Sequence, residues 1–355
     1  MPKIKLLLLG TGSMANQHAA QFRDMKDVQI VGGVDVDGAR LTTFCDTFSI
    51  PHRFADLKAA LQWGEFDAVA NVTPDGAHHP TTMACIKAGK HVFCEKPLAT
   101  NATDARAMRD AAHKADIIGM VNLTYRNGAA MSKAHQLVAD GAIGTVRHVQ
   151  AAYLQSWLTQ PAWGDWREHH QWLWRLSTAH GSGGVLGDVG VHLVDFTSFI
   201  AGDSFSELSC RLKTFAKAPK DRIGDYMLDA NDSFVIHAQM AGGALAVLHA
   251  SRWASGHIND LRLRIHGDQG GLEVVVRPQG DTLRGCLGQK DMTAGTWREL
   301  KTPPVKTMYE RFINAVRAGQ QDEPSFALGA RIQGVLDTCI ASDQAGKVLP
   351  CENES

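Results

Sequence analysis

The first 35 residues contain the pattern that most restricts the fold of this chain. Ile4–Leu9 is a short apolar run, typical of a strand buried on both faces of a parallel sheet. The turn Gly10-Thr-Gly12-Ser-Met-Ala15 follows at once, a helix is predicted over 13–25, and a second strand over 28–34 ends at Asp35. This order of strand, glycine turn, helix and acid-terminated strand predicts a dinucleotide-binding unit.

Each residue type in the turn has a mechanical reason. Gly10 permits the tight turn, Gly12 lets the backbone approach a pyrophosphate, and Ala15 is small enough for close packing of helix on sheet. The N–H groups at the helix start, around Ser13 and Met14, would face the phosphates. The match alone also fits an ordinary glycine-rich turn, but its place between a strand and a helix favours the cofactor interpretation.

Asp35 bears on the choice of cofactor. A carboxylate at this position accepts hydrogen bonds from an adenosine ribose diol and repels a 2′-phosphate, so NAD is favoured over NADP. Arg40 lies five residues further on and can weaken that preference.

Strands and helices continue to alternate up to about residue 122. Strands are predicted over 67–72, 91–94 and 117–122, and helices over 55–63, 78–89 and 101–114. This alternation predicts a doubly wound parallel sheet, on which ligands bind at the carboxyl ends of the strands. The residues at or near those ends are Thr73, Pro74, Glu95, Lys96, Pro97 and Arg126.

Composition excludes several classes of function. Lys plus Arg is 36 and Asp plus Glu is 37 in 355 residues, and this balance argues against nucleic-acid or membrane-surface binding. The apolar run Leu6–Leu9 is too short for a signal peptide or a membrane span. Seven scattered cysteines without a C-x-x-C pair favour reduced thiols in the cytoplasm. No closed set of zinc ligands and no G-x-S-x-G elbow is present, so neither a metal site nor a serine hydrolase is expected.

The second part of the chain has a different period. Strands are predicted over 146–155, 206–215, 232–240, 244–251, 261–266 and 272–277, a long loop over 216–231, and helices over 307–318 and 327–345. Short turns join the strands, which predicts an antiparallel sheet. We therefore expect a dinucleotide-binding domain over 1–124 and a substrate-binding and oligomerisation domain over 125–355.

Two features of the second part can carry chemistry. Five of the eight tryptophans fall within eighteen residues, and such a cluster fits either a packed aromatic core or a pocket for a sugar or polyol. Further on, Asp188 and His192 are four residues apart, so on a helix they would share one face. By spacing alone, a histidine in the helix core is the simpler interpretation of His192.

The segments GTGSMA, VTPDGAHH, AGKHVFCEKPLAT and GGVLGDVGVH occur in this order between about residues 4 and 195. They resemble the glucose-fructose oxidoreductase / inositol dehydrogenase (Gfo/Idh/MocA) family. The resemblance implies a Rossmann domain followed by an α+β domain with a large, mostly antiparallel, open-faced sheet. Members often bury that sheet, so it also implies a homodimer or homotetramer.

The resemblance implies roles for individual residues. Lys96 of the E-K-P motif would bind the substrate oxygen, although a surface lysine before a proline is the alternative. Asp188 and His192 resemble the catalytic helix of the family. Besides the glycine turn and Asp35, the implied cofactor residues are Thr73, Pro74, His78, Glu95, Lys96 and Arg126. The implied substrate residues are Lys96, Trp174, Arg175, Asp188 and His192.

Together these observations predict an NAD(P)-dependent dehydrogenase that moves a hydride between nicotinamide and a hydroxyl or keto group of a sugar or polyol, such as an inositol, an aldose or an anhydrosugar. An imidazole suits the role of general base, so His192 would act with Asp188 as its partner, while Lys96 stabilises alkoxide charge. Which of Lys96 and His192 takes the proton stays open. Two other functions also stay open: an NAD-using glycosidase of the same family, and a non-enzymatic cofactor-binding sensor.

Overall fold

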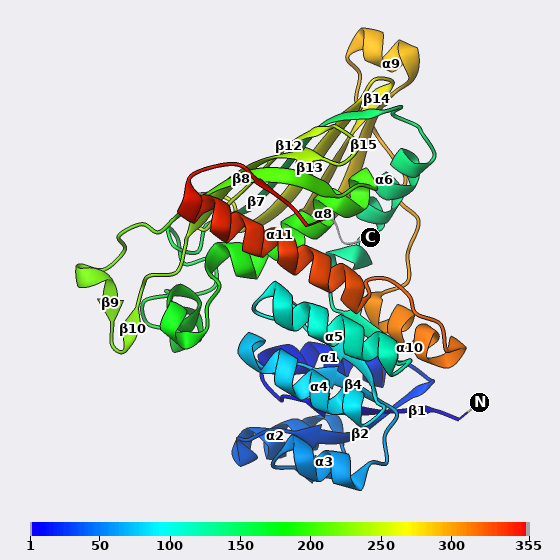
Figure 1. Cartoon of the computed structure of the whole chain (residues 1–355), viewed down its shortest axis with the longest axis vertical. Helices are drawn as coiled ribbons and strands as arrows, with labels where there is room; N and C mark the ends of the chain where they lie inside the picture. Colours follow the sequence, from blue (N-terminus) through cyan, green and yellow to red (C-terminus); the bar gives the residue numbers. More distant parts are fainter. Residues whose placement is uncertain (1, 353–355) are drawn as a thin grey trace. The chain divides into compact units, whose positions relative to one another are not determined.

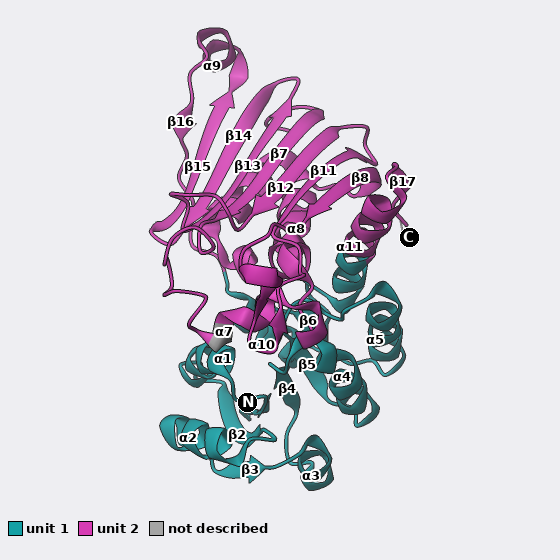
Figure 2. Ribbon diagram, turned by 90° about the vertical axis from the view of Figure 1, so that its left-hand side faces the viewer, with its two compact units in different colours: residues 1–123, 306–333 teal, residues 124–305, 334–355 magenta. Residues whose placement is uncertain are grey.

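The computed structural model describes residues 2–352 and contains two compact units (Figure 2). The first comprises 1–123 and 306–333, and the second comprises 124–305 and 334–355. The chain passes from the first unit to the second between residues 123 and 124, one residue before the boundary expected at 124/125. The structure differs over 306–333, a segment that the sequence analysis placed in the second domain and that belongs to the first unit.

The first unit is built on a parallel sheet of six strands in the order β3-β2-β1-β4-β5-β6. Figure 1 labels β1, β2 and β4 of this sheet. The strands are β1 (Ile4–Leu9), β2 (Val28–Val34), β3 (His52–Phe54), β4 (Ala68–Asn71), β5 (His91–Cys94) and β6 (Gly119–Val121). The order runs outward from β1 in both directions, as in a doubly wound sheet of two βαβ halves. The predicted Rossmann topology is confirmed.

Five helices connect these strands: α1 (Ser13–Arg23), α2 (Gly38–Phe48), α3 (Leu57–Trp63), α4 (His78–Lys87) and α5 (Ala102–Lys114). Asp37, Asp56 and Asn101 start α2, α3 and α5, and each side chain accepts a hydrogen bond from the backbone N–H three residues further on. Such caps satisfy N–H groups that have no partner within the helix. The sequence pattern did not predict α2 or β3.

Helix α10 (Met308–Ala318) packs into the core of the first unit. Its Tyr309 ring lies 5.1 Å from that of Phe22 on α1, and its Phe312 ring lies 5.2 Å from that of Phe93 on β5. The apolar period of α10 predicted the helix but could not say which sheet it covers. This packing is why 306–333 belongs to the first unit.

The second unit contains a nine-stranded sheet in the order β16-β15-β14-β13-β7-β12-β11-β8-β17. Neighbouring strands are antiparallel except for the parallel pair β7 and β12. The strands are β7 (Val146–Gln155), β8 (Phe205–Lys213), β11 (Ser233–Met240), β12 (Leu245–Ser251), β13 (Asn259–Gly267), β14 (Gly270–Arg277), β15 (Gly280–Leu287), β16 (Arg298–Glu299) and β17 (Leu349–Pro350). The large, mostly antiparallel sheet is confirmed, while β15, a strand that the pattern did not predict, is added.

The helices of this unit are α6 (Ala129–Ala139), α7 (His170–Leu173), α8 (Val191–Ala201), α9 (Gly288–Ala294) and the later part of α11 (Phe326–Ala345). Helix α8 packs on β7 and β13, and α6 packs on β14 and β15. The segment expected to be a long loop contains a short hairpin of β9 (Arg222–Ile223) and β10 (Tyr226–Met227). The pair Lys217 Nζ and Asp232 Oδ2, 2.9 Å apart and fully buried, anchors this segment.

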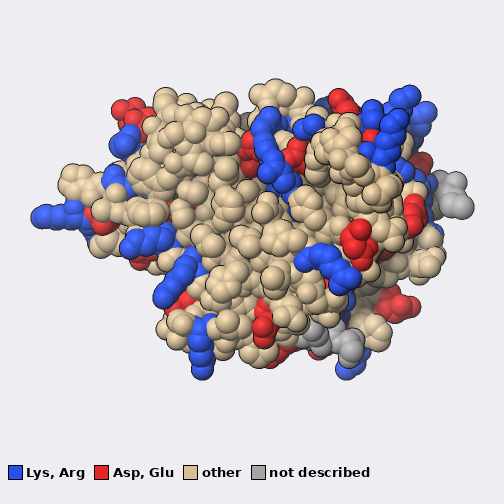
Figure 3. Space-filling model, turned by 90° about the horizontal axis from the view of Figure 1, so that it is seen from above, with Lys and Arg blue, Asp and Glu red and all other residues tan. Residues whose placement is uncertain are grey.

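The opposite face of the nine-stranded sheet is open. Val235 on β11 and Leu245 and Val247 on β12 point to this face and are exposed. In the view of Figure 3, basic and acidic side chains are interspersed over the surface, in keeping with the near-neutral composition. No helix in residues 2–352 is long and apolar enough to cross a membrane.

Replacing Phe312 by alanine tests whether α10 belongs to the first unit. The fully buried ring leaves a cavity, so we expect Phe312→Ala to lower the free energy of unfolding by roughly 3–5 kcal/mol. Hydrogen exchange should accelerate at amides of β5 while those of β13 keep their protection. Asn314→Ala, on the exposed side of the same helix, is the control and should change stability by less than about 0.5 kcal/mol. Unchanged exchange at β5 in Phe312→Ala would contradict this packing.

Candidate active site

The turn between β1 and α1 has the shape that phosphate binding needs. Gly10 has a φ of +89°, and a Cβ at this position would lie 2.6 Å from the carbonyl oxygen of Val72, so only glycine fits. A Cβ on Gly12 would meet no atom within 4 Å, and no side chain caps the start of α1 there. Ala15 is fully buried. The open backbone at Gly12 and the uncapped helix start fit a dinucleotide pyrophosphate.

Asp35 is a buried carboxylate with a full set of donors. Thr11 donates from its backbone N–H at 2.8 Å and from its hydroxyl at 2.7 Å, and the N–H of Asp37 donates at 2.9 Å. Arg40 donates from Nε at 3.1 Å and from Nη2 at 2.7 Å. Burial alone would raise the pKa of Asp35, but Arg40 and the backbone N–H groups hold this pKa well below its usual range. Arg40 is half exposed, whereas the Asp35 carboxylate is buried.

His78 joins the loops that follow β4 and β5. Its Nδ1 lies 2.7 Å from the carbonyl oxygen of Pro97, and its Nε2 lies 2.8 Å from that of Thr73. Carbonyl oxygens only accept, so both ring nitrogens donate when the imidazole is protonated. Burial opposes that charge, but the sulfur of Cys94 and the Pro97 carbonyl outweigh it and raise the pKa of His78 to about 10. The ring is fully buried, so it positions the backbone beside Pro74 and Lys96.

Glu95 is held ionised beneath the half-buried Lys96. Its Oε1 lies 2.8 Å from Nε2 of His18 and accepts from Nδ2 of Asn122 at 2.6 Å, while Oε2 accepts from the N–H of Lys96 at 3.1 Å. Burial raises the pKa of Glu95, but these contacts outweigh it and lower the pKa to about 2. The hydroxyl of Tyr309 lies 3.4 Å from Nδ2 of Asn122. The sequence analysis missed His18, although it lies three residues after Ala15 on the buried side of α1.

Arg126 lies in the second unit, where it forms a buried ion pair with Asp195 of α8. Nε donates to both carboxylate oxygens at 3.0 and 3.1 Å, and Nη2 donates to Oδ1 at 2.6 Å. The guanidinium also lies 4.2 Å from the ring centre of Phe199. These contacts of Arg126 hold α8 in place, and its role in cofactor binding stays a prediction.

The segment before α8 departs from the helix that the sequence predicted. Leu186–Gly190 forms a π-helical turn, so Asp188 lies in a widened turn while His192 lies in the first turn of α8. A Cβ on Gly184 would lie 2.3 Å from Nδ2 of Asn231. Asn231 fixes the turn because its carbonyl oxygen accepts from the N–H of Val185 at 2.8 Å and its Oδ1 from that of Leu186 at 3.0 Å. No motif or spacing in the sequence indicated this role of Asn231.

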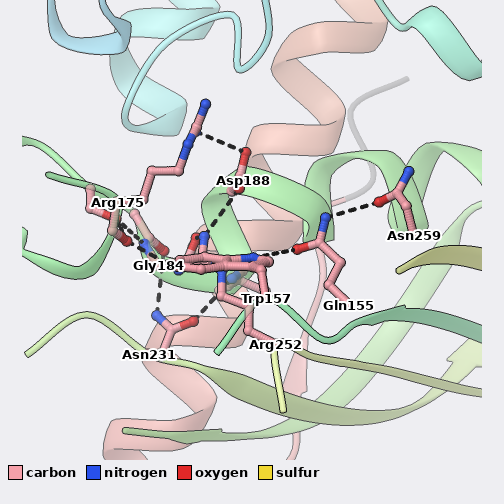
Figure 4. A network of polar contacts seen from close by, with 11 residues as sticks. Gln155, Trp157, Arg175, Gly184, Asp188, Asn231, Arg252 and Asn259 are labelled. Atoms are coloured by element: carbon pink, nitrogen blue, oxygen red, sulfur yellow. Dashed lines mark hydrogen bonds and ion pairs between the residues drawn. The ribbon is translucent and has the colours of Figure 1, made fainter. Parts of the chain in front are cut away.

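Asp188 lies between the guanidinium groups of Arg175 and Arg252 (Figure 4). Nη2 of Arg252 donates to Oδ2 of Asp188 at 3.0 Å, and its Nη1 donates to the carbonyl oxygen of Arg175 at 3.0 Å. The Arg252 side chain is fully buried and lies 5.0 Å from the ring centre of Trp157. Burial lowers the pKa of Arg252, and the Asp188 carboxylate opposes that shift. Arg252 was also missed, since it follows β12 far from the glycine-rich segment.

His192 is buried and packs edge-on against Tyr125, with 4.9 Å between ring centres. The Tyr125 hydroxyl is hydrogen bonded to that of Tyr153 and accepts from Nδ2 of Asn259 at 3.3 Å. Asn259 accepts from Gln155 at 3.0 Å, and Gln155 accepts from the Trp157 indole at 3.2 Å (Figure 4). A chain of polar contacts therefore leads from Trp157, whose ring lies against the Arg252 guanidinium, to Tyr125, whose ring packs on His192.

The tryptophan cluster divides into two parts. Trp157 and Trp166 are buried in an apolar cluster with Leu173, Leu176 and Leu228, so they form part of a satellite core. Trp174 is half buried and lies outside that cluster, with its ring centre 4.6 Å from the guanidinium of Arg175. The described residues contain no group of His, Cys, Asp and Glu arranged to hold a metal ion.

Two family models match the chain. Residues 4–123 match an oxidoreductase family with an NAD-binding Rossmann fold, and residues 131–273 match the GFO/IDH/MocA C-terminal domain. A levoglucosan dehydrogenase of Pseudarthrobacter phenanthrenivorans is 25% identical over 330 residues, covering 83% of this chain and 82% of its own length. A 1,5-anhydro-D-fructose reductase of Ensifer adhaerens is 29% identical over 80% of this chain and 81% of its own length.

The chain also matches solved structures over its full length. An oxidoreductase domain protein from Kribbella flavida is 31% identical, with a TM-score of 0.88 over 99% of this chain and 100% of that one. Both halves of the chain thus match the same family, and the relatives are named dehydrogenases and reductases. The protein is accordingly an oxidoreductase of the Gfo/Idh/MocA family with an NAD-binding Rossmann domain.

Proposed function

We propose that the enzyme oxidises a CH–OH group of a sugar or polyol, or reduces the corresponding ketone, with a nicotinamide dinucleotide as the redox partner. The names of the relatives support the substrate class. The observation that carries the proposal is the ordered environment of Asp188. Arg252 and the π-helical turn fix this carboxylate next to α8, whose first turn contains the buried His192. A carboxylate and an imidazole supply what alcohol oxidation needs, a hydroxyl ligand and a proton acceptor.

The dinucleotide would be held by the turn from Gly10 to Ala15, with Asp35 binding the adenosine ribose. The buried Asp35 carboxylate disfavours a 2′-phosphate, so NAD is the proposed cofactor, although Arg40 reduces the repulsion. When bound, this cofactor accepts or donates a hydride at its nicotinamide ring. Four further residues are proposed to help bind the cofactor mainly by shaping the loops after β4 and β5: Thr73, Pro74, His78 and Glu95.

The residues of this chain would handle the proton and the oxygen. Lys96 would donate a hydrogen bond to the reacting oxygen and stabilise alkoxide charge, since Glu95 fixes the backbone N–H of Lys96. His192 would take the proton during oxidation and return it during reduction. Asp188 would bind a substrate hydroxyl or orient His192, and Trp174 would offer an apolar surface to the C–H face of the ring.

We also propose that the enzyme is a cytoplasmic homo-oligomer. The exposed Val235, Leu245 and Val247 lie on one face of neighbouring strands, and a second copy of the chain would shield them from water. All seven cysteines are free and buried, which suits a reducing compartment.

A substrate panel tests the function directly. Inositols, aldoses and anhydrosugars are incubated with NAD and, separately, NADP, and net formation of the reduced cofactor is measured. Turnover of at least one such compound supports a dehydrogenase. Release of a free glycone without net NADH would instead show a glycosidase, and cofactor binding without any turnover would show a sensor.

Replacing the two proposed proton-handling residues should reduce turnover and spare cofactor binding. We expect His192→Asn and Lys96→Ala each to lower kcat by about 10²- to 10⁴-fold, with the Kd for NADH changed less than threefold. His79→Asn, a partly exposed histidine next to His78, is the control and should retain activity. Full activity in either replacement would refute that residue's role.

The Asp188–Arg252 pair separates a structural role from a catalytic one. Asp188→Asn leaves a buried guanidinium without its carboxylate, so we expect a loss of about 3–5 kcal/mol in the free energy of unfolding. Adding Arg252→Met removes that charge and should recover part of the stability, measured by urea denaturation. Activity should stay low in both variants. Recovery of activity in the double variant would mean that Asp188 only stabilises the fold.

Asp35 should set the preference between cofactors. Asp35→Ala removes the ribose acceptor and the charge that repels a 2′-phosphate while Arg40 remains. We expect the ratio of kcat/KM for NADP to that for NAD to rise by about 10- to 100-fold. Asp37→Asn is the control, because Asp37 also lies beside Arg40, with Oδ2 3.6 Å from Nη1, and its amide can still cap α2. A ratio that does not change in Asp35→Ala would rule out this assignment.

A further inference from the structure

We propose that the substrate carries an oxyanion, a carboxylate or a phosphate, and that Arg175 binds it. The inference rests on the proposed function, a sugar or polyol oxidoreductase, and narrows its substrate class to charged sugars. It follows from the balance of charge around Asp188, from the unused hydrogen-bonding capacity of Arg175, and from the way the Arg175 side chain is held.

The charges around Asp188 do not cancel. Arg252 is the close counter-ion of Asp188, at 3.0 Å and with no exposed side-chain surface. Arg175 lies further away, with Nη1 3.6 Å from Oδ1 of Asp188, and its side chain is 28% exposed. Among the described residues the Asp188 carboxylate therefore contacts two guanidinium groups. The charge of Asp232 also acts on Arg252, but Asp232 is itself paired with Lys217. Because Arg252 already neutralises Asp188, Arg175 contributes an excess positive charge that is open to solvent.

The guanidinium of Arg175 also has unused donors. Arginine has five N–H donors and no acceptor. In the described part of the chain the Arg175 guanidinium has one carboxylate contact, the 3.6 Å ion pair, and its buried Nε has no hydrogen-bond partner. The neighbouring indole Nε1 of Trp172 is likewise buried without a partner. These N–H groups can only donate hydrogen bonds, so a ligand bound here should carry hydrogen-bond acceptors.

The backbone and the side chain of Arg175 are nevertheless well fixed. Its carbonyl oxygen accepts from Nη1 of Arg252 at 3.0 Å and from the hydroxyl of Ser182 at 2.6 Å. Its guanidinium lies 4.6 Å from the ring centre of Trp174 and 5.6 Å from that of Trp172. Stacking on indoles restrains the plane of the guanidinium and leaves its N–H edge for an acceptor. A preorganised fork of this kind matches the two oxygens of an oxyanion.

A neutral hydroxyl is a weaker match for this arrangement. It accepts from only one of the parallel N–H groups and brings no charge, whereas hydrogen bonds between ions are roughly twice as strong as neutral ones. The alternative role for Arg175 is to position Asp188 for a neutral sugar. If Arg175 binds an anion, its loss should raise KM for anionic substrates. If Arg175 positions Asp188, its loss should lower kcat for neutral and anionic substrates alike.

The test compares chemically matched substrates. Wild-type enzyme is assayed with glucose, glucuronate, gluconate and glucose 6-phosphate, each with NAD. We expect at least one anionic member to exceed glucose in kcat/KM by 10-fold or more, and its KM to rise with ionic strength. The carboxylates and the phosphate form separate arms, so the preferred one identifies which oxyanion is bound. A preference for glucose over all three anions would overturn the proposal.

Two variants then assign the effect to Arg175. Arg175→Gln should lower kcat/KM for the preferred anion at least 10-fold more than it lowers kcat/KM for glucose, and the loss for the anion should arise mainly through KM. Arg175→Lys should restore part of the loss, because it restores the charge. The control is Arg167→Gln, since Arg167 also lies over an indole, 4.9 Å from the ring centre of Trp166, but is mostly exposed and paired with Asp165. Equal losses of kcat for glucose and for the anion would overturn the proposal and make Arg175 a positioning residue.

A binding measurement distinguishes failure of this inference from failure of the proposed function. Calorimetry is carried out with gluconate, glucuronate, glucose 6-phosphate and glucose on wild-type enzyme and Arg175→Gln, in the presence of NADH. An anion that binds wild type at least 10-fold more tightly than Arg175→Gln, but is not turned over with any cofactor, would keep the anion site and reject the dehydrogenase. Turnover of neutral sugars with no arginine-dependent anion binding would keep the dehydrogenase and reject the anion site.

Discussion

The buried Arg252 guanidinium is the group on which the second unit's candidate site depends. It donates to Asp188, to the carbonyl oxygen of Arg175 and to that of Gly184, at 3.0, 3.0 and 3.4 Å. It therefore connects a carboxylate, an arginine backbone and the glycine before the π-helical turn. A charge without access to water is stable only with such partners. The contacts of the two Nη atoms of Arg252 thus also determine where the Asp188 carboxylate lies.

The first unit also contains a buried ion held by hydrogen-bond partners, but this ion is negative. There the buried ion is the Glu95 carboxylate, and its partners are His18 from α1, Asn122 after β6 and the N–H of Lys96. Tyr309, from a helix late in the chain, completes the cluster. In each unit a partly exposed group proposed for chemistry is adjacent to a buried one. The buried group cannot move without losing its hydrogen-bond partners. The partly exposed group next to it is therefore also held in place.

The sequence predicted those features whose physical cause is local. The turn at Gly10, the buried strand before it and the acid at Asp35 depend on φ, on apolar runs and on neighbouring residues, and all can be identified from a few residues. His18, Asn231 and Arg252 could not be found in this way, because each is defined by a partner distant in the chain. The π-helical turn has the same origin, since Asn231 holds it from outside. The apolar face of α10 was visible in the sequence, whereas the sheet it covers was not.

The excess charge at Arg175 shows why composition excluded some functions but left the substrate open. Over the whole chain, 36 basic and 37 acidic residues nearly cancel, and this balance argues only against partners that need an extended field. Recognition of a small ligand depends instead on two or three groups that are shielded from water. Around Asp188 the sum is positive because Arg252 already neutralises the carboxylate and Arg175 remains. A protein of near-zero net charge can therefore carry a local excess of positive charge, and we propose that this excess, at Arg175, selects an anionic substrate.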